Sequence, residues 1–306
     1  MKIAVMGTGA MGGYVGARLA EAGADVTFIA RGPHLAAIQQ NGLKVTSPQG
    51  DLHINPAKAT GDPGAVGPMD LVFLGVKLYD VETAVRDLMP MVGPETGIVS
   101  LQNGVETPAI ISEIAGAEHS VPGVALINGE IAAPGVIQHN AMNGMTLGEP
   151  DGQDSPRMRR FGELAQKAAL DIKISPDILL ELWRKFLMLT PAAGLSILTR
   201  VPMGRIRETS ASWRLIGEAL AEVIAVAQAE GIEMGDGDFQ ATSSFIRDTM
   251  PDTWRGSLVE DLEAGRRLEV EWLHGTICRL GEKHGIDTPF HRTVLGALMP
   301  HANGRN

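Results

Sequence analysis

The chain has 306 residues, of which 44% are hydrophobic and 20% are charged, a composition typical of a globular protein. This length exceeds what one hydrophobic core usually serves, so two domains are expected. The formal net charge of −10 argues against a general nucleic-acid-binding protein, which needs a basic surface. The charge is compatible with a local basic pocket for a small anion.

A single cysteine, Cys278, is present, so no internal disulfide can form and a reducing compartment is expected. We expect a structural role for this thiol on a helix face rather than a reactive one. The chain opens directly on the strand-like MKIAVMG, without the pattern of a secretory signal, and no apolar run is long enough to span a bilayer. These features predict a cytoplasmic protein with no membrane partner.

The first half of the chain alternates short apolar runs with helical stretches. Alternating strands and helices are typical of a parallel sheet covered on both faces. The strands are expected at 2–6, 25–29, 70–74 and 97–102, and the helices at 11–22 and about 80–90. Further strands, VPGVALI, PGVIQH and MTLGEP within 120–150, are expected to extend the sheet edge, and a helix from Ser155-Pro156 and a strand at 171–174 to close the domain.

From residue 175 onward the pattern predicts helices only. Pro176 suits the first turn of a helix capped by Ser175. Long helices are expected at 211–230 and at 257–284, the latter ending at Gly285, and a last helix begins at Pro289. The sequence therefore predicts an α/β domain over 1–174 followed by an all-helical substrate or catalytic domain over 175–306.

The segment 5-VMGTGAMGG-13 contains the pattern G-x-G-x-x-G, placed between an expected strand and an expected helix. In a Rossmann-type domain the first glycine permits a tight turn, the second lets the backbone approach a pyrophosphate, and the third lets helix and strand pack closely. The helix N-terminus adds free N–H groups for the phosphates. We therefore expect a dinucleotide to contact Gly7, Thr8, Gly9, Ala10, Met11 and Gly12.

The residue after the second strand indicates which dinucleotide binds. An NAD site usually has an acidic residue there, which bonds the ribose 2′-hydroxyl, whereas this chain has Arg31 in the run 27-TFIARGPH-34. A guanidinium can hold a 2′-phosphate by forked, charge-assisted hydrogen bonds. NADP(H) is therefore predicted over NAD(H); the alternative is that Arg31 is an ordinary solvated side chain.

Two charged residues interrupt apolar helical faces in the second half. Lys185 shares a stripe with Ile178, Leu182 and Leu189, and Glu269 shares one with Trp272 and Thr276. Burying an unpaired charge is costly, so each is expected to have a polar partner or ligand nearby. From periodicity alone, both could equally reach solvent or form a structural ion pair.

Together these segments resemble the ketopantoate reductase (2-dehydropantoate 2-reductase) family. The resemblance spans nearly the whole chain and implies a Rossmann domain followed by a helical domain, and reduction of a 2-oxo acid with NADPH. It rests on GTGAMGG, RGPHL, VK at 76–77, QNGVE at 102–106, PGVIQH, WRKF at 183–186 and SLVEDLEAGRRLEVE at 257–271.

The resemblance also implies roles for individual residues. Lys185 would donate the proton to the substrate carbonyl oxygen and stabilise the developing alkoxide. Glu269 would hold that lysine or the nicotinamide end of the cofactor. Asn103 would lie beside nicotinamide and substrate, Lys77 would line the cofactor cleft, and Ser257 would bond the substrate carboxylate. The alternatives are purely structural roles: Asn103 in a turn, Lys77 as a surface charge and Ser257 as a helix cap.

The chain departs from the family at the substrate end. Three positions where ketopantoate-reducing members carry asparagine are Leu189, Ala193 and Met203 here. A pocket without amide groups discriminates little in favour of a substrate hydroxyl, so we expect a 2-oxo acid with a more apolar tail. Pro191 also falls within the catalytic helix, which it could kink.

Two other functions fit the same residues. One is a D-2-hydroxy-acid dehydrogenase of the same superfamily that acts on an apolar or aromatic substrate, with either NAD or NADP as its cofactor. The other is an NADP-sensing protein without turnover. No HExxH motif or Cys/His cluster indicates a metal. The apolar helices of the second domain could form a homodimer surface or only a core.

Overall fold

The computed structural model describes residues 1–305 and forms two compact units. The first unit comprises Met1–Gln102 and Thr107–Glu181, and the second comprises Asn103–Glu106 and the chain from Leu182 onward. The short segment 103–106 therefore belongs to the second unit, although the chain on either side of it belongs to the first. The predicted domain boundary after residue 174 stays a prediction.

The first unit is built on one mostly parallel sheet of ten strands, within the described residues 1–305. The strand order is β4-β3-β9-β8-β7-β6-β1-β2-β5, and β10 pairs with β9. The strands are β1 (Lys2–Met6), β2 (Asp25–Ile29), β3 (Leu43–Thr46), β4 (Leu52–Ile54), β5 (Lys58–Thr60), β6 (Leu71–Leu74), β7 (Gly97–Ser100), β8 (Ser120–Ala133), β9 (Val136–Leu147) and β10 (Asp171–Ile174).

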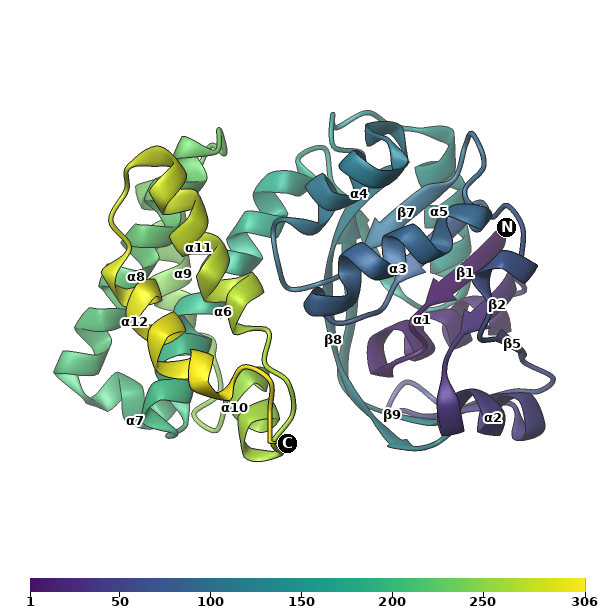
Figure 1. Ribbon diagram of the computed structural model, residues 1–306, viewed down its shortest axis with the longest axis horizontal. Coiled ribbons are helices and arrows are strands. Elements are labelled where there is room, and N and C mark those ends of the chain that lie inside the picture. The colour runs from purple at the N-terminus through teal and green to yellow at the C-terminus, as the bar shows by residue number, and fades with distance from the viewer. Residues whose placement is uncertain (306) are drawn as a thin grey trace. The chain divides into compact units, whose positions relative to one another are not determined.

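Helices cover both faces of this sheet, as the alternating pattern predicts (Figure 1). One core joins the sheet to α1 (Ala10–Glu21) and α5 (Pro156–Lys167), and the other joins it to α3 (Val81–Leu88) and α4 (Thr107–Ala115). The central strands β6 and β7 are buried along their whole length. This explains why β6 (LVFL) is a continuous apolar run and why neither strand alternates apolar with charged residues. Helix α2 (Gly32–Asn41) follows β2.

The region 120–150 forms one long antiparallel hairpin, β8 and β9, with bulges. The expected separate strand MTLGEP is the end of β9 at Leu147 followed by irregular backbone, so that prediction was wrong in detail. Strands β3, β4 and β5 are not among the expected strands.

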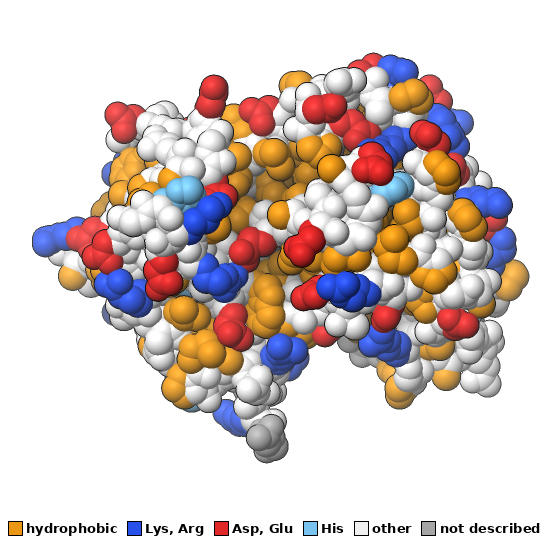
Figure 2. All heavy atoms as spheres, turned by 45° about the horizontal axis from the view of Figure 1, so that its top comes forward, with side chains coloured by type: hydrophobic (Ala, Val, Ile, Leu, Met, Phe, Trp, Pro, Cys, Tyr) orange, Lys and Arg blue, Asp and Glu red, His pale blue; other side chains and the backbone are white. Residues whose placement is uncertain are grey.

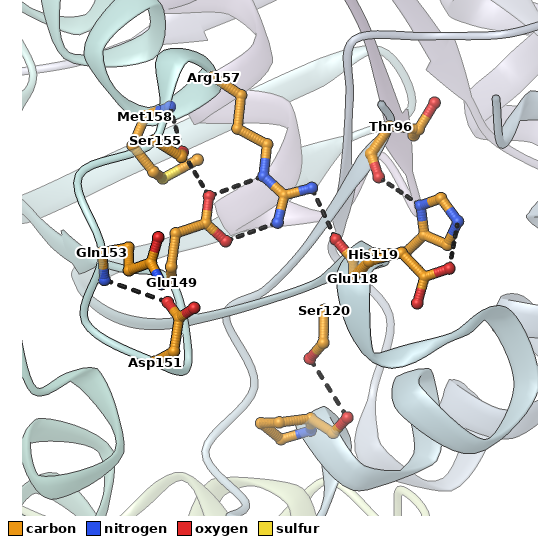
Figure 3. Close-up of polar contacts among 11 residues, drawn as sticks. Thr96, Glu118, His119, Ser120, Glu149, Asp151, Gln153, Ser155, Arg157 and Met158 are labelled. Atoms are coloured by element: carbon orange, nitrogen blue, oxygen red, sulfur yellow. Dashed lines mark hydrogen bonds and ion pairs between the residues drawn. The ribbon is translucent and has the colours of Figure 1, made fainter. Parts of the chain in front are cut away.

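A buried ion pair joins the end of this hairpin to α5 (Figure 3). Arg157 donates from Nε and Nη2 to the two carboxylate oxygens of Glu149 at 2.7 and 2.5 Å, and Ser155 Oγ donates to the same carboxylate. The helix expected from Ser155-Pro156 is α5, and Ser155 caps it by accepting from the Met158 N–H. This cluster lies near the amino ends of β6 and β7, the edge opposite the glycine-rich turn that follows β1, so we assign it a structural role.

The second unit has no strand among its described residues and consists of helices (Figure 1). Helix α11 packs against α12 and α8. The elements are α6 (Ile178–Thr199, which begins in the first unit), α7 (Met203–Glu208), α8 (Ser210–Ala229), α9 (Asp236–Ser244), the π-helical turn η5 (Phe245–Thr249), α10 (Ser257–Glu263), α11 (Val270–His284) and α12 (Pro289–Leu298).

Two expectations about these helices are wrong. The single helix over 257–284 is two helices, because Gly265 adopts a left-handed φ of +68° that ends α10. Helix α6 begins at Ile178 rather than at Pro176: Asp177 Oδ1 accepts from the Leu180 N–H, and Ser175 Oγ accepts from the Asp177 N–H. Asp177 therefore provides the cap that was expected from Ser175.

Within residues 1–305, every helix lacks the combination of length and apolar character that crossing a bilayer needs. The same residues contain no group of three His, Cys, Asp or Glu side chains placed to hold a metal ion. On the face drawn in Figure 2, Lys and Arg side chains lie interspersed with Asp and Glu. That face therefore carries no continuous basic field, and the absence of a nucleic-acid partner stays a prediction.

Candidate active site

A cavity of about 280 Å³ lies in the first unit where β1 and β2 end. Because the carboxyl ends of parallel strands meet at one edge, the turns after these strands share its wall. Its lining residues are Met6, Gly7, Thr8, Gly9, Ile29, Ala30, Arg31, His34, Val76, Asp80, Thr83, Ala84 and Ile131. The glycine-rich turn and Arg31, which are 22 residues or more apart in sequence, thus border one space.

The glycines of the turn have the geometry that their spacing predicts. Gly7 adopts φ +93°, and a Cβ there would lie 2.7 Å from Val76 Cγ1. A Cβ on Gly12 would lie 2.6 Å from the Gly7 carbonyl oxygen and 2.9 Å from Val5 Cγ1, so only glycine lets α1 approach β1 this closely. Ala10 and Met11 form the first turn of α1, whose N-terminal N–H groups and dipole favour an anion.

Arg31 is exposed at the rim of this cavity. Its side chain is 77% exposed, and Nη2 donates to Asp87 Oδ2 at 3.2 Å. A surface ion pair of this kind contributes little to stability, so the guanidinium can exchange its partner for a ligand phosphate at small cost. Lys77 is also exposed and directly follows Val76 of the cavity wall.

The first and last residues of the motif QNGVE, Gln102 and Glu106, both form side-chain hydrogen bonds. Gln102 is buried and donates from Nε2 to the Leu74 and Val76 carbonyl oxygens at 2.7 and 3.2 Å, which fixes the end of β7 beside the end of β6. Glu106 Oε2 accepts from Thr276 Oγ1 and Arg279 Nη2, each at 2.6 Å. These bonds anchor the segment that carries Asn103 on α11. Sequence reasoning missed Glu106, although it lies within the quoted motif.

Lys185 lies in the middle of α6 in the second unit. Its neighbours Phe186 and Leu182 are buried, and Lys185 itself is largely removed from solvent. Burial lowers the pKa of the Lys185 ammonium from 10.5 to about 8, because a poorly hydrated cation is disfavoured. A lysine with such a pKa is still mostly protonated at neutral pH and releases its proton more readily than an exposed one.

Glu269 and Ser257 belong to the same unit as Lys185. Glu269 is 6% exposed and immediately precedes α11, rather than lying inside a helix as expected. Ser257 is the first residue of α10, and the cap position is held by Gly256. The serine side chain is exposed, so the alternative of a helix-capping serine does not apply.

Two of the three positions that replace asparagines are buried. Ala193 and Met203 are 2% and 0% exposed. A Cβ added to Gly256 would lie 2.9 Å from Ala193 Cβ, and the Met203 N–H donates to the Trp254 carbonyl oxygen. Two of these positions therefore contact the segment that leads into Ser257. Leu189 lies one turn after Lys185 on α6.

Helix α6 continues from Ile178 to Thr199 with Pro191 inside it. The proline removes one backbone donor, while Thr190 Oγ1 donates to the Phe186 carbonyl oxygen at 2.9 Å within the same helix. The helix is not terminated at the proline, so Lys185 and Ala193 remain on one helix.

The expected residues thus fall into two groups. The first unit holds residues 7–12, Arg31 and Lys77, and the second holds Asn103, Lys185, Ser257 and Glu269. Sequence reasoning missed the other walls of the cavity. Thr83 and Ala84 of α3 line it because the end of β6 adjoins the end of β1. The pattern RGPHL could have indicated His34, which follows Arg31 closely.

Comparison with known proteins shows which family the chain resembles. The family described as "Ketopantoate reductase PanE/ApbA" matches residues 3–152, and its C-terminal part matches residues 177–302. A 2-dehydropantoate 2-reductase of Caulobacter vibrioides is 32% identical over 97% of each chain. A PanE/ApbA family ketopantoate reductase from Ralstonia eutropha JMP134 has a similar structure, with a TM-score of 0.89, 29% identity and coverage of 99% of this chain and 98% of that one.

A third comparison concerns the fold alone. A D-mandelate dehydrogenase solved with NADH and anilino(oxo)acetate has a TM-score of 0.87 at 22% identity, covering 99% of this chain and 98% of that one. At that identity the match shows a shared architecture and nothing about substrate. The two family matches together cover most of the sequence: the first includes the glycine-rich turn, and the second includes Lys185 and Glu269. This chain belongs to the ketopantoate reductase family of oxidoreductases.

Proposed function

We propose that this protein reduces a 2-oxo acid to a 2-hydroxy acid with NADPH, and that Lys185 donates the proton. The observation that carries the proposal is the environment of Lys185, whose burial in α6 holds its pKa at about 8. A general acid works best when its pKa lies near the pH at which it operates. An ordinary solvated lysine, with a pKa of 10.5, would give up its proton far less readily.

The first unit supplies the features that an NADP(H) site needs. The left-handed turn at Gly7 and the N-terminus of α1 suit a pyrophosphate, and Arg31 on the same cavity wall suits a 2′-phosphate. Lys77 and Asn103 are the further residues that we assign to cofactor binding. When bound, NADPH supplies the hydride.

The remaining chemistry belongs to side chains of the second unit. As the carbonyl carbon is reduced, negative charge develops on its oxygen, and the Lys185 ammonium stabilises this charge and transfers a proton to it. We assign Glu269 to orienting the lysine or the nicotinamide end, because a buried carboxylate needs a fixed polar partner. Ser257 and Asn103 are assigned to the substrate.

The identity of the 2-oxo acid depends on the three replaced asparagines. The names of the relatives favour ketopantoate, and with it a place in pantothenate biosynthesis. The apolar Leu189, Ala193 and Met203 favour a substrate with a more apolar tail, because a pocket without amide partners gains nothing from a substrate hydroxyl. We propose this second substrate class on that observation alone.

A panel of 2-oxo acids tests both statements. Oxidation of NADPH, and then of NADH, is followed at the nicotinamide absorbance band with ketopantoate and with branched and aromatic 2-oxo acids. The proposal expects turnover with NADPH and a higher kcat/KM for an apolar acid. A strong preference for ketopantoate would refute the apolar-tail reading, and no turnover with any acid would refute the proposed activity.

A further inference from the structure

Glu106 ends the motif QNGVE, and the proposed mechanism assigns it no function. Its side chain reaches α11: Oε2 accepts from Thr276 Oγ1 and from Arg279 Nη2, each at 2.6 Å. The three residues belong to the second unit, although Glu106 precedes its two partners by 170 and 173 residues. This contact fixes where the segment 103–106 lies on the unit.

The two donors on α11 are themselves held in place. Thr276 is 0% exposed, and its hydroxyl oxygen accepts from Arg279 Nη2 at 3.1 Å. Arg279 Nη1 in turn donates to the Glu271 carbonyl oxygen at 3.0 Å, within the same helix. The hydroxyl and the guanidinium therefore present a preformed pair of donors to one carboxylate oxygen.

This network contributes little to the stability of the fold. The Arg279 and Glu106 side chains are 51% and 32% exposed, and an ion pair with this much access to water is worth little. If Glu106 is removed, the Thr276 hydroxyl keeps the Trp272 carbonyl oxygen as an acceptor at 2.9 Å, so no buried donor is left unpaired. The main consequence of the contact is therefore where it holds the backbone of the segment 103–106.

The network links two residues that we assign to the reaction. Helix α11 begins directly after Glu269, whose carbonyl oxygen accepts the first N–H bonds of the helix at 3.1 Å. Thr276 follows Glu269 by about two turns, or about 10 Å, along this helix. Asn103 precedes Glu106 by three residues and is partly exposed, so its position depends on where the segment is held.

The other end of the segment is held as well. Gln102 directly precedes Asn103, and its side chain donates to the Leu74 and Val76 carbonyl oxygens. Asn103 therefore lies in a stretch whose two flanking residues are both anchored. Ordering a free segment costs conformational entropy, and a segment that is ordered before the ligands bind lowers the barrier to a reactive geometry.

We propose that Glu106 is a positioning residue: by binding Thr276 and Arg279 it holds Asn103 at a fixed place relative to Glu269. The inference rests on the proposed function, because it takes Asn103 and Glu269 as residues of the reaction. Glu106 itself contacts neither ligand and acts through the backbone of the segment 103–106. A displacement of about 1 Å at a reacting centre can lower the rate about 10²-fold, so loss of this anchor lowers activity more than stability.

Three substitutions separate positioning from a general structural role. Glu106→Ala removes the anchor, and Glu106→Gln tests rescue, because its amide oxygen can accept from the same two donors. Glu230→Ala is the matched control: Glu230 is 24% exposed, and its Oε1 lies 2.7 and 2.5 Å from Lys283 Nζ and His284 Nε2. Glu230 thus also joins a carboxylate to two side chains of α11, but in the last turn of that helix, and we assign it no part in the reaction.

The test combines steady-state oxidation of NADPH by the best 2-oxo acid of the panel, calorimetric titration with NADP+ and urea unfolding, all on the full-length chain. We expect Glu106→Ala to lower kcat/KM for the acid about 10- to 100-fold, Glu106→Gln to return to within about fivefold of the parent, and Glu230→Ala to stay within about twofold. NADP+ affinity should change by less than about threefold in Glu106→Ala, because the glycine-rich turn and Arg31 are assigned to its phosphates. The urea midpoint of Glu106→Ala should shift no further than that of Glu230→Ala.

A double-mutant cycle with Arg279→Met tests whether the contact itself is responsible. Arg279→Met removes the same ion pair from the side of α11 without altering the segment 103–106. If the two residues act through their contact, the double variant with Glu106→Ala should lose no more kcat/KM than the more impaired single variant.

Three results would overturn the inference. If Glu106→Ala keeps the kcat/KM of the parent, Asn103 needs no such anchor. If Glu230→Ala loses as much activity as Glu106→Ala, the losses come from a general loosening of α11. If the losses of Glu106→Ala and Arg279→Met multiply in the double variant, the two residues act separately. In each case a parent that reduces a 2-oxo acid leaves the proposed function intact, whereas a parent without turnover refutes the proposed function and with it the basis of this inference.

Discussion

Lys185 should lower the stability of the folded protein, and replacing it should raise that stability. Burial disfavours its charged form, so the native state holds this proton less tightly than the unfolded state. The change to make is Lys185→Met, which keeps a long unbranched side chain and removes the charge.

The pKa gives the size of the effect. A shift from 10.5 to about 8 corresponds to about 3 kcal/mol, at about 1.4 kcal/mol for each pH unit. Because the side chain keeps some exposed surface, screening by solvent reduces this figure, and we expect a gain of about 2–3 kcal/mol at pH 7. The unfolded state binds more protons than the native state between pH 8 and 10.5, so the gain should shrink as the pH rises through that window.

Denaturant unfolding followed by tryptophan fluorescence measures the stability of the second unit, which contains Lys185. All four tryptophans, at 183, 213, 254 and 272, belong to the second unit. Lys283→Met is the matched control, because Lys283 belongs to the same unit, is 59% exposed and pairs with Glu230 at the surface; its effect should stay below about 1 kcal/mol. A Lys185→Met variant no more stable than the parent at pH 7, or a gain independent of pH up to 10.5, would refute the reasoning.

Three further outcomes follow from other groups. Arg31→Ala should weaken NADPH binding at least about tenfold in a nucleotide titration with little change for NADH; equal losses would mean that the guanidinium does not contact the extra phosphate. Arg157→Met should lower the free energy of unfolding by about 3–5 kcal/mol in thermal or denaturant melts, because it removes the ion-pair partner of buried Glu149. The control Arg159→Met, at an exposed ion pair, should change the free energy of unfolding by under about 1 kcal/mol. Equal losses of stability in the two variants would contradict the burial of the Arg157–Glu149 pair. Burial lowers the pKa of His291 to about 4, so as the pH falls the unfolded state binds a proton at this residue before the folded state does. The free energy of unfolding should therefore decline by up to about 3 kcal/mol from pH 6.5 to 4. If the same decline is measured in His291→Asn, this histidine is not its cause.

Local sequence patterns predicted the strands and helices that carry strong hydrophobic periodicity. The strand at 25–29, the helix capped by Ser155 and the last helix from Pro289 are at the expected places. The strand is a short apolar run, and each helix combines a buried apolar set with a cap or a proline at its start. These determinants act within a few residues, so they can be read from the local sequence.

The errors arise where a distant contact or a single backbone angle decides. The apolar stripe across Gly265 matched a continuous helix, yet the left-handed φ of that glycine ends α10 and moves Glu269 to the residue before α11. Strands β3 to β5 were missed, and their place in the sheet depends on distant pairing: β3 pairs with β9, and β5 pairs with β2.

The candidate site likewise has features that the local sequence predicts and features that depend on distant contacts. The glycine spacing and Arg31 could be read from the sequence, because each follows a strand whose end is predictable. The pKa of Lys185 could not, since it depends on how much solvent the packed side chains around it exclude. The hydrogen bond that the Gly135 N–H donates to His34 Nδ1 joins residues 101 positions apart, and therefore only the folded chain reveals it.

The central claim is that Lys185 donates the proton in the reduction of a 2-oxo acid. Steady-state oxidation of NADPH by the best acid of the panel, compared between the parent and Lys185→Ala, tests it most directly. We predict that kcat falls by about 10²–10⁴-fold in the variant while NADPH binding is retained, because the contact with the developing alkoxide exists only in the transition state. Turnover by Lys185→Ala at the rate of the parent would contradict the account.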